Sequence, residues 1–193
     1  MSSGAYDVPV LMYHSVGVPN KKWDWNYLTC PFEQFEEQLE AIHEMGYQTI
    51  SLQELHGYMT NGSQLPRNAI AITFDDGYLD VWVYAYGLLK KYGMCATVFI
   101  NPEFVDPSKG LRKRYCCDGH VDSFPETGFL NWDEIKRMDS EGVIYCESHA
   151  LTHTWYPISD KIIDFRHPHD PYRWMTWNEN VEQKYRLQID DDD

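Results

Sequence analysis

Basic residues are scarce in this sequence. Its 193 residues include 16 Lys and Arg but 30 Asp and Glu, so the formal net charge is −14. Nucleic-acid binding requires clustered Lys and Arg that neutralise phosphates. We therefore expect no nucleic-acid partner. Part of the acidity lies in residues 188–193, which we expect to form a solvated acidic tail.

Features of membrane insertion and export are also missing. No apolar run approaches the ~18 residues that a membrane-spanning helix needs. Residues 1–7 contain no basic segment followed by an apolar one, so no secretory signal is visible. We expect no membrane span and a cytoplasmic location.

The cysteines form no pattern typical of a disulfide framework. Their number is five, which is odd, and no Cys-x-x-Cys pair occurs. We expect free thiols, as in a reducing compartment. The cysteines are Cys30, Cys95, Cys116, Cys117 and Cys146.

The chain does contain a regular alternation of strand-like and helix-like segments. Apolar residues make up 43% of it, and 193 residues suffice for one domain with a sizeable core. We expect a single α/β domain over residues 1–193, with about five parallel strands and helices outside them. Predicted strands cover residues 8–12, 47–51, 69–74, 95–100 and 143–146, and predicted helices cover residues 31–45, 52–59, 79–92, 131–140 and 178–187. Residues 16–29 and 101–129 read as loops.

Two adjacent carboxylates follow the most apolar of these strands. The run Ala69–Phe74 is typical of a fully buried strand, and Asp75, Asp76 and Gly77 come directly after it. Carboxylates at such a position need a cation, hydrogen bonds or a shared proton. The carboxyl end of a parallel strand is also where α/β proteins bind ligands. The alternative is an ordinary turn with both acids in water.

Two histidines follow the last predicted strand. His149 and His153 are four positions apart, which on a helical turn places both imidazoles on one side. Parallel strands end on the same side of a sheet, so these histidines can meet Asp75 and Asp76. One carboxylate and two imidazoles can hold a divalent metal with positions left for water and substrate, and the second carboxylate can act as general base. Alone, the histidine spacing is also common on surface helices.

These motifs resemble those of a known enzyme family. Thr73–Gly77 (Thr-Phe-Asp-Asp-Gly) together with His149 and His153 is similar to the polysaccharide deacetylase family, carbohydrate esterase family four, which includes the nodulation-type chitooligosaccharide deacetylases. The amino-acid sequences of Leu11–His14 and Trp132–Lys136 also resemble those of the same family.

The resemblance covers roughly residues 8–154 and implies a fold and a chemistry. It implies a distorted or incomplete (β/α) barrel that removes acetyl groups from N-acetylated sugars or polysaccharides. By resemblance, Asp75 is the catalytic base, and Asp76, His149 and His153 bind the metal. Zinc is the expected ion, and cobalt, nickel and manganese are alternatives that the ligand set also allows.

The sequence departs from the family after His153. The family has a later Arg-x-Pro motif, which Arg166-His167-Pro168 echoes, and a late Leu-x-His motif, which this chain lacks. We expect Arg166 and His14 to be substrate-binding or supporting residues. The alternative for His14 is a strand-end histidine that bonds a carbonyl.

A shortened barrel has consequences for assembly and function. The sequence shows fewer strands than the family barrel has, so we expect a shortened barrel, a fragment of a longer protein, or a barrel that a partner chain completes. A barrel without its last strands has open sheet edges. We expect a homo-oligomer, or a C-terminal segment, to cover them. The main functional hypothesis is a metal-dependent deacetylase acting on an N-acetylated carbohydrate. The alternatives are a carbohydrate-binding pseudo-enzyme that retains the metal site, and a metal-dependent amidase or esterase on a non-sugar acyl group.

Overall fold

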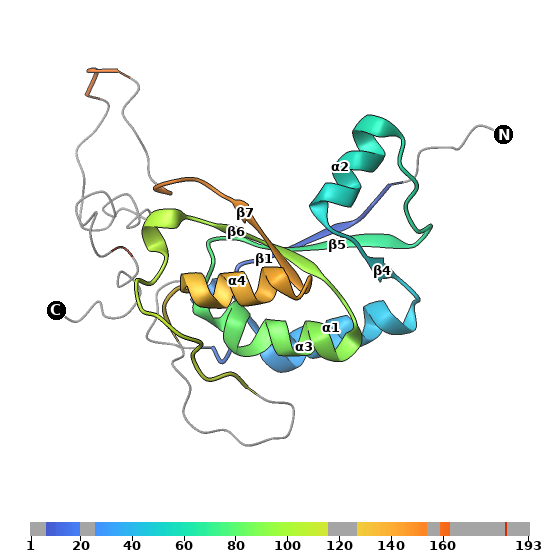
Figure 1. Cartoon of the computed structure of the whole chain (residues 1–193), viewed down its shortest axis with the longest axis horizontal. Coiled ribbons are helices and arrows are strands. Elements are labelled where there is room, and N and C mark those ends of the chain that lie inside the picture. Colours follow the sequence, from blue (N-terminus) through green and yellow to red (C-terminus); the bar gives the residue numbers. More distant parts are fainter. Residues whose placement is uncertain (1–6, 20–25, 116–126, 154–158, 163–183, 185–193) are drawn as a thin grey trace.

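The computed structural model describes residues 7–19, 26–115, 127–153, 159–162 and 184 (Figure 1). Five strands form one sheet in which every pairing is parallel, with the order β1-β5-β6-β7 and β4 paired to β5. The predicted sheet of about five parallel strands is thus confirmed. The strands are β1 (Val10–Tyr13), β4 (Gln48–Thr49), β5 (Ala69–Phe74), β6 (Ala96–Ile100) and β7 (Ile144–Ser148).

The helices lie mostly on one side of this sheet. In Figure 1, α1, α3 and α4 cover one face, whereas α2 lies on the other side of β5. The capping box predicted at Ser51 and Glu54 is present and begins α2. A second capping box, formed by Asn131 and Glu134, begins α4. The helices are α1 (Phe32–Glu44), α2 (Leu52–Asn61), α3 (Tyr86–Tyr92) and α4 (Trp132–Ser140), with 3-10 turns η1 (Asn26–Leu28) and η3 (Pro102–Phe104).

Strand β5 runs through the middle of the core. All six of its residues are buried. Ile70, Ile72 and Phe74 belong to the main apolar cluster, which also contains the inward side chains of the helices, while Ala69 and Ala71 belong to a smaller cluster beside α2. Because a strand's side chains alternate between faces, β5 is covered on both sides, and its sequence is therefore a continuous apolar run.

The structure corrects three predictions of secondary structure. The helix predicted over 79–92 begins with a π-helical segment, Val81–Ala85, and only then continues as α3. Its five consecutive side chains are all buried, which one face of a regular α-helix cannot provide. The predicted loop 16–29 includes parts of a short parallel pair, β2 (Ser15–Gly17) and β3 (Thr29–Pro31). The predicted strand 47–51 forms only two paired residues.

Other expectations concern features of the whole chain. In the described part of the chain, Cys30, Cys95 and Cys146 are free thiols, as expected. None of the described helices has the length and apolarity needed to cross a bilayer. Among the described strands of the sheet, β1, β4 and β7 each pair with one neighbour and so have an open edge. A homo-oligomer or C-terminal segment covering these edges stays a prediction. The predicted helix at 178–187, apart from Lys184, and the acidic tail at 188–193 lie outside the described residues.

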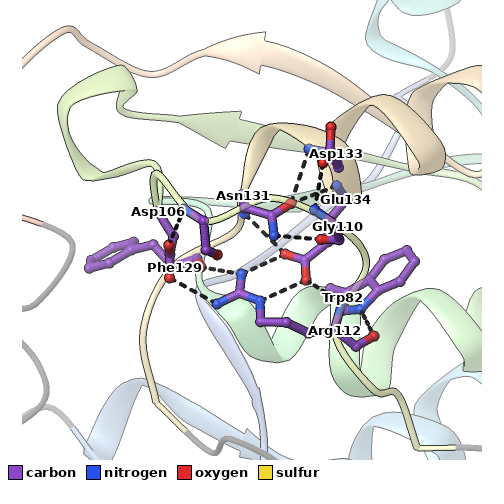
Figure 2. Close-up of polar contacts among 9 residues, drawn as sticks. Trp82, Asp106, Gly110, Arg112, Phe129, Asn131, Asp133 and Glu134 are labelled. Carbon is purple, nitrogen blue, oxygen red and sulfur yellow. Dashed lines mark hydrogen bonds and ion pairs between the residues drawn. The ribbon is translucent and has the colours of Figure 1, made fainter.

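An arginine network attaches the long segment between β6 and α4 to the fold (Figure 2). The Arg112 guanidinium donates to both carboxylate oxygens of Glu134, at 2.7 and 2.5 Å, and to Asp106 at 3.1 Å. It also donates to the Phe129 carbonyl. The Glu134 side chain is 0% exposed, so the charge of Arg112 compensates the cost of burying the Glu134 carboxylate.

The anchored segment lies along the Asp-Asp-Gly turn. The Leu130 amide donates to the Gly77 carbonyl, and the Leu79 amide donates to the Gly128 carbonyl, both at 2.9 Å. The Tyr78 and Phe129 rings stack with their centroids 5.3 Å apart. The network around Arg112 therefore holds the chain that supports this turn.

We expect Arg112→Met to destabilise the protein by about 3–5 kcal/mol, because it leaves the Glu134 carboxylate buried without its cation. The double variant Arg112→Met/Glu134→Gln removes both charges and keeps a side chain that can complete the capping box, so its loss should be smaller. Urea unfolding gives both free energies of unfolding. An equal loss in the single and double variants would contradict this account.

The π-helical segment follows a buried carboxylate, Asp80. Asp80 is 7% exposed, and one of its oxygens accepts a hydrogen bond from the Ser15 hydroxyl. The other oxygen has no hydrogen-bond partner in the described part of the chain. Burial raises the pKa of Asp80 from its ordinary value of 3.8 to about 7. The folded protein therefore binds this proton more tightly than the unfolded chain does.

The stabilisation that comes from this proton is complete below pH ~4 and is lost as the pH rises to about 7. Asp80→Asn keeps the site neutral. We expect its advantage in free energy of unfolding over the wild type to grow between pH 5 and pH 8, by on the order of 2–3 kcal/mol. Urea unfolding at both pH values checks this. A difference that is the same at pH 5 and pH 8 would show that the carboxyl does not titrate as stated.

Candidate metal centre

The Asp-Asp-Gly turn is built by the end of β5. The Asp75 amide donates to the Tyr13 carbonyl at 2.9 Å, which continues the pairing of β5 with β1. Asp76 and Gly77 then adopt left-handed backbone conformations, with φ of 70° and 73°. Asp tolerates this conformation better than most residues, and a Cβ on Gly77 would lie only 3.0 Å from the Ile100 side chain. The turn is therefore tight, and it requires glycine at position 77.

The Asp76 carboxylate is enclosed by polar groups from neighbouring strand ends. Its side chain is 10% exposed. The same oxygen, Oδ1, lies 3.2 Å from Nδ2 of Asn101, 3.2 Å from Nε2 of His153 and 3.6 Å from Nε2 of His149. Asn101 directly follows β6, and His149 directly follows β7. The carboxyl ends of three adjacent parallel strands thus meet at one carboxylate.

The backbone that places the histidines beside this carboxylate differs from the helical turn that their spacing predicted. The His149 amide donates to the Ile100 carbonyl at 2.9 Å, so His149 still belongs to the pairing of β7 with β6. The residues after it form bends, not the expected helical turn. His153 has a left-handed backbone with φ of 48°, which turns its side chain back toward His149. The two imidazole centroids are 5.3 Å apart.

These three side chains fit a divalent metal ion. These residues form a group that could hold a metal ion, and Asp76 Oδ1 lies 3.2 and 3.6 Å from the two Nε2 atoms, as ligand atoms do when each is about 2.0–2.2 Å from a common ion. The histidine side chains are 33% and 25% exposed, so the site faces solvent on their side. Two imidazole nitrogens and a carboxylate oxygen suit zinc, and also cobalt, nickel or manganese.

Three further residues were predicted for the site, namely Asp75, His14 and Arg166. Asp75 is half-buried beside Asp76. His14 is half-buried and directly follows β1, the neighbour of β5, as expected. Arg166 lies outside the described residues.

Sequence reasoning missed two residues near the candidate ligands. Asn101 is 1% exposed and donates to Asp76. Asn101 is a polar residue directly after an apolar strand, which is the same signal that singled out Asp75 and Asp76. Lys184 is also 1% exposed and contacts the loop that carries His153. Nothing in the local sequence indicated this contact.

Comparisons with known proteins identify the class. The sequence matches the polysaccharide deacetylase family over residues 62–186. It is 33% identical over 146 residues to YxkH of Bacillus subtilis (strain 168), whose name assigns it to the polysaccharide deacetylases. It is 23% identical over 133 residues to the poly-beta-1,6-N-acetyl-D-glucosamine N-deacetylase of Escherichia coli (strain K12). The chain belongs to the polysaccharide deacetylase family.

Solved structures show the same fold. The deacetylase PplD of Streptococcus pyogenes, solved in complex with acetate, superposes with a TM-score of 0.58 at 22% identity over 75% of this chain. IcaB of Ammonifex degensii gives a TM-score of 0.57 at 24% identity over 74% of this chain. This chain spans 56% of the PplD chain, 52% of the IcaB chain, 43% of YxkH and 19% of the Escherichia coli enzyme.

We expect the protein to bind one zinc ion, and His149→Ala to weaken this binding at least tenfold because it removes one of three ligands. Isothermal titration of the metal-free protein with zinc chloride measures the dissociation constant. His56→Ala is the matched control, since His56 lies on the exposed side of α2. Equal zinc affinity in His149→Ala and His56→Ala would place the metal elsewhere.

Proposed function

We propose that this chain is a metal-dependent hydrolase that removes the acetyl group from an N-acetylated sugar or polysaccharide. One observation carries the proposal: Asp76, His149 and His153 meet beside Asp75 at one end of a parallel sheet, in a chain of the polysaccharide deacetylase family. When bound, the divalent ion supplies a site that polarises the acetyl carbonyl and acidifies water.

The residues of the chain have distinct parts in this reaction. Asp76, His149 and His153 hold the metal, and the Asn101 amide keeps the Asp76 carboxylate in place through its hydrogen bond at 3.2 Å. Asp75 accepts the proton of the water that attacks the acetyl carbon. The bond between that carbon and the sugar nitrogen then breaks as the nitrogen takes up a proton, and the products are acetate and a free amino sugar. His14 and Arg166 remain proposed substrate-binding or supporting residues.

The proposed substrate class rests on relatives of the chain. The Escherichia coli relative, and relatives from Staphylococcus aureus that are 28% identical over 128 residues, have names that specify poly-beta-1,6-N-acetyl-D-glucosamine. An oligomer of N-acetylglucosamine is therefore the first substrate to test. The histidine side of the site, which faces solvent, is the side from which such a chain can approach.

A carbohydrate-binding protein without catalysis is the second candidate. It would keep the metal site formed by Asp76, His149 and His153 and would bind the carbohydrate without cleaving it. The two functions differ in one observable, which is acetate release.

We expect the zinc-loaded protein to release acetate from β-1,6-linked N-acetylglucosamine oligomers, and Asp75→Asn to lower kcat by about 10²–10⁴-fold because it removes the base. An enzyme-coupled acetate assay measures both. The control is Glu37→Gln, which neutralises an exposed acid on α1 and should leave kcat unchanged. Wild-type kcat in Asp75→Asn would remove Asp75 from the reaction. Oligomer binding by the wild type without acetate release would favour the binding protein.

A further inference from the structure

The buried ammonium group of Lys184 contacts the loop that carries His153. Lys184 is 1% exposed, and its Nζ forms an ion pair with the Glu103 carboxylate. The same Nζ donates to the Thr152 carbonyl at 3.3 Å. Lysine is among the residues that are least often fully buried, and its burial requires partners of this kind. Lys184 thus joins parts of the chain that are 81 and 32 residues away in sequence.

The partners of Lys184 belong to two segments that flank the candidate ligands. Glu103 and Phe104 lie in η3, which follows Asn101, the residue that donates to Asp76. Thr152 is the residue immediately before His153. Lys184 therefore connects the segment beyond β6 to the histidine loop beyond β7.

The same two segments also contact each other directly. The Glu103 amide donates to the Leu151 carbonyl at 3.3 Å. The Phe104 ring lies edge-on to the His153 imidazole, with 6.4 Å between their centroids, and the Lys184 Nζ is 5.7 Å from the Phe104 centroid. Phe104 itself is 1% exposed, so this is a packed arrangement rather than a surface contact.

The histidine loop needs such support. Residues 149–153 form no helix or strand, and His153 has a backbone conformation that few residues other than glycine adopt. The imidazole can therefore keep its place near Asp76 only if contacts around the loop hold it. An unpaired ammonium near a divalent ion would repel it, but the carboxylate of Glu103 neutralises Lys184.

We propose that Lys184, paired with Glu103, is a positioning residue that fixes His153 for metal binding. This inference rests on the proposed function, in which His153 is a metal ligand. It assigns to Lys184 an effect on the metal centre that acts through the histidine loop. A role as a mere anchor would affect folding stability and leave the metal affinity of the folded protein unchanged.

The test is isothermal titration with zinc chloride of folded, metal-free wild type, Lys184→Met and Lys184→Arg. We expect Lys184→Met to bind zinc 10–100-fold more weakly, as is usual when a residue that orients a ligand is lost. Lys184→Arg keeps the charge and the donors, so it should recover most of the affinity. Lys91→Met is the matched control, because it removes an exposed lysine that pairs with Glu36 at 2.6 Å.

If Lys184→Met does not fold, the double variant Glu103→Gln/Lys184→Met replaces it, since it leaves no buried charge without a partner; it should show the same loss of zinc affinity. Wild-type zinc affinity in either variant would overturn the inference while the proposed function stands. A wild type that binds no zinc would overturn both.

Discussion

The burial of the Asp76 carboxylate is the constraint on which the rest of the structure depends. An ionised carboxylate with a side chain only 10% exposed costs several kcal/mol unless charge and hydrogen bonds compensate it. The compensating groups, Asn101, His149 and His153, come from the ends of the two strands that follow β5 in the sheet. The sheet must therefore place three strand ends at the same level. A divalent cation held by Asp76, His149 and His153 would complete this compensation.

The surroundings of Asp76 are built to keep its turn in one position. The segment 128–130 bonds both sides of the turn at Gly77 and Leu79, and the Arg112–Glu134 ion pair holds that segment. On the other side, η3 and the buried Lys184 support the loop that presents His153. Rigid support of this kind is what a metal ligand set requires, because an error of a fraction of an ångström in ligand position weakens the site.

Much of this arrangement was predictable from the sequence, for identifiable reasons. The apolar run of β5 and the rule that parallel strands end on one side were enough to predict that His149 and His153 meet the aspartate pair, and the resemblance to the family implied that Asp76 is the ligand. The three-residue strands β2 and β3 and the π-helical segment were missed because short elements and fully buried segments carry no clear period. The left-handed His153 and the contacts of Lys184 arise from packing between distant parts of the chain, which leaves no local signal.

The central claim is that one metal ion binds to Asp76, His149 and His153. X-ray absorption spectroscopy of the zinc-loaded protein tests it most directly, because imidazole rings give a characteristic outer-shell scattering. We expect two imidazole nitrogens at about 2.0–2.1 Å from the zinc ion, together with oxygen donors. A spectrum without imidazole scattering, or one dominated by sulfur at about 2.3 Å from the free cysteines, would contradict it.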